Sequence, residues 1–342
     1  MDDQRIPVTI ITGFLGAGKT TLLNNLIKQY NDKKFAIIEN EFGEIGIDGG
    51  LIVGANENIF ELANGCICCS LNDDFYKAIS QLMDGDYVFN HLLIETTGIA
   101  DPDTIIKAFV SSEDIQMQFR LDSVICLADA INMEDLIDEE PEVRKQLALS
   151  DIVLLNKIDA VQLDYAHDLT KLIKEINPSA EVYPVAHADV TELNILDTFA
   201  FSGKSIEKTT LSFRNLTFSK VKSVTCPTVV TGRKEHRHDI TSEGFSIPGS
   251  FDIGKFSLWM QNFLHFNSDT MFRVKGIVSF DEMQERYIFH AVRSTYMFEI
   301  GEPWGTETRF SKLIFIGKEI NRDVLENNLY QLLSKPEKEF VQ

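Results

Sequence analysis

The sequence lacks the features that would point to a membrane, secreted or nucleic-acid-binding protein. No apolar run approaches the roughly 20 residues that a helix needs to cross a bilayer. The first ten residues, MDDQRIPVTI, have no basic segment ahead of an apolar one, so we expect no secretory signal. Basic residues are outnumbered, 32 against 52, and the net charge of −20 repels phosphate backbones and acidic lipids. We therefore expect neither nucleic acid nor a membrane as a partner.

Cysteine is scarce and unevenly placed. Of the five cysteines, three stand within four positions, at Cys66, Cys68 and Cys69. The disulfide framework of a secreted protein would instead have an even number of cysteines spread along the chain. We therefore expect a reduced, cytoplasmic protein. Cys126 lies in an apolar run, which predicts a place in the core.

The 342 residues are 44% hydrophobic and 25% charged, an ordinary globular balance, and the length suggests two domains. In the first half, short apolar runs alternate with helical stretches, which predicts an α/β domain with a mainly parallel sheet over residues 1–200. A helix is expected at 19–30. The expected strands are 7–12, 35–39, 91–95, 123–129, 152–156 and 181–185.

Residues 201–224 are rich in Ser, Thr and Lys without a clear period, which predicts a linker. Beyond it, short connections between apolar runs favour antiparallel hairpins. We expect a smaller C-terminal α+β domain over residues 225–342. Its expected strands are 239–247, 271–280, 286–292, 295–300 and 309–316, and its expected helices are 253–265 and 321–333.

Residues 13–20, GFLGAGKT, match the phosphate-binding pattern G-x-x-x-x-G-K-[ST] between a predicted strand and a predicted helix, which favours a P-loop NTPase domain. Glycines let the backbone N–H groups point inward at phosphates, and the helix N-terminus adds partial positive charge. Lys19 would reach the β- and γ-phosphates, and the Thr20 hydroxyl would ligate Mg²⁺. The alternative is a Gly-rich turn with an exposed lysine. The residues expected to bind the nucleotide here are Gly13, Gly16, Ala17, Gly18, Lys19, Thr20 and Thr21.

Residues 156–159, NKID, follow an apolar run and match the guanine-reading pattern N-K-x-D. The Asp159 carboxylate would accept hydrogen bonds from guanine N1–H and the exocyclic amine, whereas adenine presents an acceptor at N1. Asn156 and Lys157 complete the pattern, and the backbone N–H of His187 could contact guanine O6. A solvated turn after the strand is the alternative.

Two further carboxylates follow predicted strands. Glu95 could hold Mg²⁺ through water, which makes Lys19, Thr20 and Glu95 the candidate catalytic residues, and Gly98 could offer its N–H to the γ-phosphate. Glu39 could add a hard ligand to a bound metal or contact Mg²⁺. The alternatives are an ordinary carboxylate at a strand end and a solvated acidic turn.

The cluster NGCICCS, residues 64–70, suits a soft metal. Three thiolates nearly fill a tetrahedral zinc site, and an open fourth position would suit a protein that passes the metal on. A redox dithiol of Cys66 and Cys69 and an inert buried cluster are the alternatives. His236 and His238 could also bind metal, and surface histidines without a role are equally compatible with their spacing.

Five stretches of the sequence resemble, in this order, the CobW/YjiA-type GTPases: GFLGAGKTTLLNNLI, IENEFGEIGID, NGCICCS, LLIETTGIADP and LLNKID. These GTPases are P-loop metallochaperones related to the nickel-insertion GTPases of hydrogenase and urease. The stretches FRVKGIVSF and KLIFIGKEI are similar to the C-terminal domain of that family. The resemblance implies GTP or GDP, Mg²⁺ and Zn²⁺ as cofactors. It also implies that Cys66, Cys68 and Cys69 bind zinc or another transition metal, with Glu39 as an extra ligand. Many relatives carry a long His-rich tract, and here only EHRHD stands in its place.

The resemblance implies that GTP hydrolysis drives metal delivery to a client metalloprotein, and we expect the intrinsic rate to be slow because no arginine finger is evident. A sensor of metal or GTP with negligible turnover and a thiol redox enzyme are the competing classes. Formation of a homo-oligomer is left open.

Overall fold

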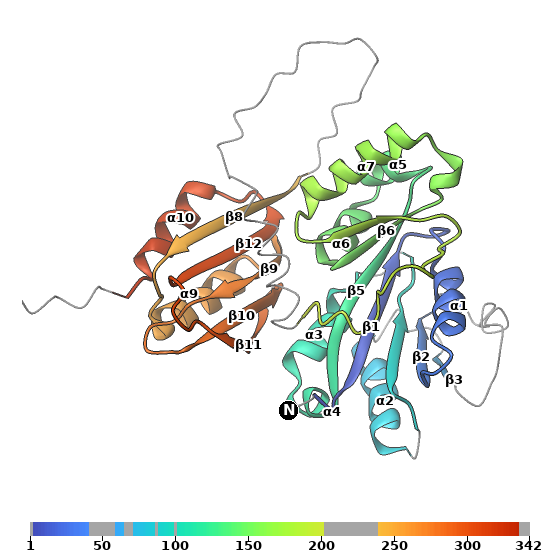
Figure 1. Ribbon diagram of the computed structural model, residues 1–342, viewed down its shortest axis with the longest axis horizontal. Helices are drawn as coiled ribbons and strands as arrows, with labels where there is room; N and C mark the ends of the chain where they lie inside the picture. Colours follow the sequence, from blue (N-terminus) through green and yellow to red (C-terminus); the bar gives the residue numbers. More distant parts are fainter. Residues whose placement is uncertain are drawn as a thin grey trace, which may run out of the picture.

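The structure, a computed structural model, describes residues 3–40, 59–64, 71–85, 88–98, 101–201 and 239–334. These residues form a parallel sheet with its helices and a separate antiparallel sheet with two helices, drawn side by side in Figure 1. The expected boundaries of the domains and linker stay predictions. Within the described ranges, no helix has the length and apolar character that crossing a membrane requires.

The first sheet confirms the predicted P-loop α/β architecture. Among the described residues it has seven strands, all parallel, in the order β3-β2-β4-β1-β5-β6-β7. The strands are β1 (Ile6–Gly13), β2 (Phe35–Asn40), β3 (Ile59–Asn64), β4 (His91–Glu95), β5 (Phe119–Asp129), β6 (Ile152–Asn156) and β7 (Glu181–Pro184). The helical segments are α1 (Lys19–Gln29), α2 (Leu71–Asp84), α3 (Asp103–Ser111), α4 (Glu113–Gln118), α5 (Met133–Glu139), α6 (Pro141–Leu149), η1 (Ile158–Ala160) and α7 (Leu163–Ile176).

Helices cover both faces of this sheet, which explains why its strands are apolar throughout. Val8 and Ile10 of β1 pack into the core on one face, and Ile11 packs into the core on the other. On that second face, Leu22 and Leu26 of α1 are fully buried against the sheet. The apolar, helically spaced side of α1 thus holds the turn between β1 and α1 against the carboxyl end of the sheet.

The second sheet is antiparallel, in the order β11-β10-β9-β12-β8, as the hairpin connections predict. Its elements are β8 (Ile240–Pro248), α9 (Ile253–Phe266), β9 (Met271–Val278), β10 (Glu285–Val292), β11 (Thr295–Pro303), β12 (Phe310–Lys318) and α10 (Arg322–Gln331). The side chains alternate between the two faces of each strand. Phe315 packs in the core with α9 and α10, whereas Ile314 and Ile316 pack in the core of the parallel-sheet domain.

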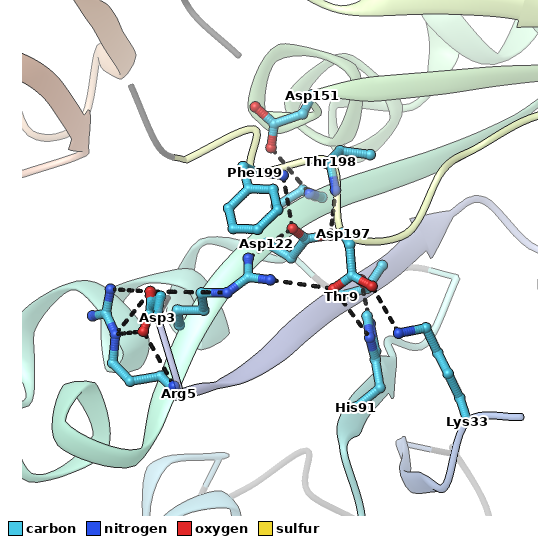
Figure 2. Close-up of polar contacts among 12 residues, drawn as sticks. Asp3, Arg5, Thr9, Lys33, His91, Asp122, Asp151, Asp197, Thr198 and Phe199 are labelled. Carbon is cyan, nitrogen blue, oxygen red and sulfur yellow. Dashed lines mark hydrogen bonds and ion pairs between the residues drawn. The ribbon is translucent and has the colours of Figure 1, made fainter. Parts of the chain in front are cut away.

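The irregular segment after β7 reaches the amino-terminal edge of the parallel sheet, where residues 197–199 form a strap across it (Figure 2). The Asp122 carboxylate accepts hydrogen bonds from the backbone N–H groups of Thr198 and Phe199, at 3.1 and 2.8 Å. The Arg120 guanidinium lies 4.0 Å from the centre of the Phe199 ring and forms an ion pair with Asp197 at 3.2 Å. Burial raises the pKa of Asp122 despite these contacts. The strap is thus tied to β5 by polar contacts as well as by packing.

His91 lies beneath the strap with no exposed surface. Its Nε2 is 3.0 Å from the Thr9 hydroxyl, and its Nδ1 is 4.0 Å from the carboxylate of Asp197, which also pairs with Lys33 (Figure 2). Burial lowers the pKa of His91 to about 3, with Lys33 and Arg120 acting in the same direction and Asp197 opposing them. The imidazole is therefore neutral in the folded protein at ordinary pH.

This burial predicts a specific acid sensitivity. Unfolded His91 binds a proton near its ordinary pKa of about 6.5, so stability is complete above that pH and falls as the pH drops toward 3. Between pH 7.5 and 5 the loss is about 2 kcal/mol. We expect the variant His91→Gln to lose less stability over this range than the wild type in urea unfolding at both pH values. His167→Gln, at an exposed position of α7, is the control, and equal losses in wild type and His91→Gln would contradict the assignment.

Candidate functional site

The turn between β1 and α1 needs glycine at its first position. Gly13 has a φ of 137°, and a Cβ there would lie 2.4 Å from the carbonyl oxygen of Leu127 on β5. A side chain at Gly16 would instead project into open space, and Gly18 has a φ of 110° as the N-cap of α1. The loop is thus pressed against β5 on one side and open on the other. Ala17 is buried, and Thr21 is exposed in the first turn of the helix.

Lys19 is not the exposed lysine of an ordinary turn. Its side chain is 9% exposed, and Nζ donates to the carbonyl oxygens of Gly13 and Phe14 at 2.9 and 3.4 Å. The ammonium group therefore lies over the loop itself. A phosphate in the loop would offer this cation a charged acceptor, which makes a stronger hydrogen bond than a neutral carbonyl.

Thr20, in the first turn of α1, and Glu95, the last residue of β4, come together at the carboxyl end of the sheet. Ile11 of β1 pairs with Glu95 at the end of β4, which brings this carboxylate beside the start of α1. The Thr20 hydroxyl donates to Oε1 of Glu95 at 3.4 Å. A hydroxyl and a carboxylate oxygen at this separation fit Mg²⁺, which takes few protein oxygens and completes its shell with water and phosphate.

Gly98 lies against the phosphate loop. A Cβ at this position would be 2.6 Å from the backbone nitrogen of Leu15, so a larger residue would displace the loop. The carbonyl oxygen of Gly98 accepts a hydrogen bond from Nε2 of Gln146 on α6 at 3.0 Å. Helix α6 therefore holds the residue whose N–H is expected near the γ-phosphate.

Asn156 ties two loops together at the end of β6. Its Nδ2 donates to the carbonyl oxygen of Ala17 in the phosphate loop, and its Oδ1 accepts from the N–H of Ala188, both at 2.8 Å. Asn156 is 3% exposed. Because the Asn156 amide makes these two contacts, Asn156 positions the phosphate loop and the loop after β7 relative to one another.

The loops after β6 and β7 hold non-glycine residues in the left-handed region. The φ angles are 63° at Lys157, 53° at His187 and 50° at Ala188. Such residues persist where surrounding contacts impose the conformation, and they concentrate at ligand sites. Here Nζ of Lys157 pairs with Asp129 at 2.9 Å, and the Asn25 amide donates to the carbonyl oxygens of His187 and Ala188.

Asp159 and His187 form the open rim of this arrangement. The side chains of Asp159 and His187 are 44% and 83% exposed, and the nearest approach of the two is 3.7 Å. Both are accessible to a ligand. Three residues that brace the site escaped sequence analysis because each acts through another residue: Asn25, Asp129 and Gln146. Asp129 could have been found from the sequence, because it is a carboxylate at the end of the apolar strand β5, as Glu95 is at the end of β4.

The candidate metal ligands Cys66, Cys68 and Cys69 and the histidine pair 236 and 238 lie outside the described residues, and Glu39 is described by its backbone alone. In the described part of the chain, no three His, Cys, Asp or Glu residues are grouped as metal ligands would be. Cys126 is buried in the core as predicted, and burial raises the pKa of its thiol to about 12.

Comparison with known families supports this description over most of the chain. Residues 7–184 match the model of the CobW/HypB/UreG nucleotide-binding domain. Residues 240–333 match the model of the cobalamin synthesis protein cobW C-terminal domain. The two matched segments correspond to the parallel-sheet and antiparallel-sheet parts of the structure.

Individual relatives match along nearly the whole length. The chain is 35% identical over 316 residues to the zinc chaperone YjiA of Escherichia coli, covering 91% of this chain and 94% of that protein. It is 28% identical over 313 residues to the zinc-regulated GTPase metalloprotein activator 1 of Schizosaccharomyces pombe, covering 85% and 76%. The crystal structure of the Zn(II)-bound YjiA GTPase from E. coli superimposes with a TM-score of 0.70 at 28% identity, covering 97% and 100% of the two chains. The chain belongs to the CobW/HypB/UreG family.

Proposed function

We propose that this protein is a Mg²⁺-dependent GTPase that binds a transition metal, zinc in the first instance, at Cys66, Cys68 and Cys69 and delivers it to a client metalloprotein. The observation that carries the nucleotide part is the double hydrogen bond of Asn156, which joins the phosphate loop to the loop after β7. A ligand spanning both loops has a phosphate end and a base end. The relatives named as a zinc chaperone and a zinc-regulated GTPase support the metal part.

In the proposed reaction, Lys19 binds the β- and γ-phosphates and Asp159 reads guanine. Thr20 and Glu95 would hold Mg²⁺, which supplies charge neutralisation at the phosphates. Gly98, whose carbonyl is held by Gln146 and which lies against the phosphate loop, would offer its N–H to the γ-phosphate. We expect the intrinsic rate to be slow, because hydrolysis without an arginine finger is slow in GTPases generally.

The metal part of the proposal follows from the direction of the strands. Asn64, the last residue of β3, pairs with Asn40 of β2, and Glu39 of β2 pairs with Glu95 of β4. The strand that precedes the cysteine motif therefore ends at the same edge of the sheet as the phosphate loop. Three strand spacings of about 4.8 Å put the ends of β3 and β1 roughly 14 Å apart. That separation suits two neighbouring sites that influence one another without sharing ligands.

Single-turnover phosphate release with and without Zn²⁺ tests the proposed function. Release of phosphate by the wild type, at a rate that zinc or a zinc-bound client changes, is the expected result. A protein that binds GTP and zinc but releases no phosphate would instead be a sensor. A disulfide that forms reversibly between Cys66 and Cys69 without any need for GTP would favour the redox enzyme.

We predict that Lys19→Ala lowers the rate of GTP hydrolysis at least about 100-fold, because it removes a cation from the place where negative charge develops. The fold should survive, since the amino group donates to carbonyl oxygens of the loop itself. Lys28→Ala, at an exposed position of the same helix, is the matched control. Hydrolysis by Lys19→Ala at the wild-type rate would remove Lys19 from the phosphate site.

We predict that Asp159→Asn weakens GTP binding roughly 10- to 100-fold, because hydrogen bonds to a charged acceptor contribute about 1.5–3 kcal/mol. Binding of xanthosine triphosphate should improve, since xanthine has a carbonyl where guanine has its amine and an amide can donate to it. Competition between the two nucleotides for the wild type and the variant measures the change. An unaltered preference for GTP would exclude Asp159 from the base site.

We predict that zinc affinity differs about 5- to 150-fold between the states bound to GDP and to a non-hydrolysable GTP analogue, the usual range of coupling between two sites. Replacing Cys66, Cys68 and Cys69 together by Ser should abolish zinc binding and leave GTP binding intact. Competition with a chelating dye gives both affinities, and Cys126→Ala is the control for loss of an unrelated thiol. Equal zinc affinities in the two nucleotide states would contradict the coupling.

A further inference from the structure

The two domains are joined at a buried carboxylate. Asp151, at the start of β6, accepts from the backbone N–H of Val124 and is paired with Arg273 and Lys275 of β9, at 2.5 and 3.2 Å. Arg273 also donates to the carbonyl oxygen of Leu149 at the end of α6. Arg273 is 1% exposed. Removing one partner of such a pair leaves an uncompensated buried charge, so this joint fixes the C-terminal domain against the end of α6.

Arg293 makes a second contact between the domains, in the turn between β10 and β11. Its Nε donates to Asp103 at 3.2 Å and its Nη2 to Asp101 at 3.4 Å, both at the start of α3. Its Nη1 donates to the carbonyl oxygens of Ser268 and Asp269, and the guanidinium lies 4.1 Å from the centre of the Phe272 ring. The side chain is 9% exposed. The guanidinium is thus fixed within the C-terminal domain and holds two carboxylates of the other domain.

These carboxylates lie a few positions after Gly98, which is in contact with the phosphate loop. Asp101 is three positions after Gly98, and Lys145 of α6 pairs with Asp101 at 3.5 Å. The next residue of the same helix, Gln146, holds the carbonyl of Gly98. Gly98 in turn lies against the backbone of Leu15 in the phosphate loop. A continuous set of contacts therefore runs from Arg293 to the phosphate loop.

The surroundings of Arg293 leave room for the start of α3 to shift. A cleft of about 420 Å³ lies between the domains at this contact. Its lining includes Asp103, Lys107, Lys145, Phe272, Arg293 and Lys318. Asp101 is also 25% exposed, unlike the buried Asp151. The two joints therefore differ: one is buried on all sides, and the other borders an open space.

We infer that Arg293 is a positioning residue for GTP hydrolysis: through Asp101 and Asp103 it sets the place of Gly98 at the phosphate loop. This inference rests on the proposed GTPase function. The contacts of Asp151 hold the C-terminal domain in place, and Arg293 is held with it. Removing the guanidinium frees the start of α3, and Gly98 loses its alignment with the γ-phosphate while the phosphate and base loops keep their own contacts.

Single-turnover hydrolysis with protein in excess over GTP tests the inference, because it yields the rate constant and the half-saturating protein concentration separately. We expect Arg293→Ala to lower the rate constant about 5- to 50-fold, since misplacement far from the chemistry costs up to roughly 100-fold. The half-saturating concentration should change less than about 3-fold. Arg293→Lys should recover part of the rate because it keeps a cation beside the carboxylates.

Arg322→Ala is the matched control. Arg322 pairs with Glu243 and lies over the ring of Phe245, both within the C-terminal domain, so its loss should leave the rate constant unchanged. Asp101→Asn removes a carboxylate of the contact without changing its shape, and it serves as the second variant if Arg293→Ala does not fold. A folded Arg293→Ala or Asp101→Asn protein with the wild-type rate constant would overturn the inference.

Hydrogen exchange separates this inference from the proposed function. In the wild type, exchange of the amides of residues 101–111 should differ between GDP and a non-hydrolysable GTP analogue, and Arg293→Ala should abolish the difference. A wild type that shows this difference but does not hydrolyse GTP would contradict the proposed function and leave the coupling standing. The same nucleotide-dependent difference in wild type and Arg293→Ala would overturn the coupling.

Discussion

The common direction of the strands is the constraint on which the candidate site depends. Because the pairs formed by β1, β2, β3 and β4 are all parallel, their carboxyl ends meet at one edge of the sheet. The phosphate loop follows β1, and Glu39 and Glu95 lie in the last residues of β2 and β4, although Gly13 and Glu95 are 82 positions apart in the sequence. Ligands of open α/β sheets bind at this edge for the same reason. A reversed strand would carry its terminal residues to the opposite edge.

The amino-terminal edge of the same sheet has a different use. There the polar groups are buried and paired with one another: Asp122 with the strap, His91 with Thr9, and Asp151 with Arg273 and Lys275. Buried charges of this kind add little net stability, because the loss of hydration offsets the attraction between them. They do set geometry, since an arrangement that separates them leaves a buried charge unpaired. We interpret this edge as the part that fixes how the C-terminal domain and the strap are held.

The sequence predicted the parallel sheet, the phosphate loop and the antiparallel C-terminal sheet well, because each rests on local patterns of apolar residues and glycines. It did not predict β3 or α2, or that β5 begins at Phe119. Arg120 and Asp122 interrupt the apolar pattern at the start of β5. Their contacts with the strap account for them, and Phe199 lies 77 positions after Asp122. Asn25, Gln146 and Arg293 were missed for a related reason. Arg293 meets Asp103 across 190 positions, and no local pattern records such a contact.

The left-handed backbone at His187 and Ala188 has a consequence for how this protein could change over time. A non-glycine residue in this region costs of order 1–3 kcal/mol, and glycine at the same place would relieve that cost. Glycine would keep the backbone hydrogen bonds to Asn25 and Asn156, but it would widen the range of conformations open to the loop. The most stable sequence at these two positions is therefore not the one that keeps the rim of the site rigid. Selection for heat resistance alone would act against the loop, and the strained pair marks a place where stability and ligand recognition oppose one another.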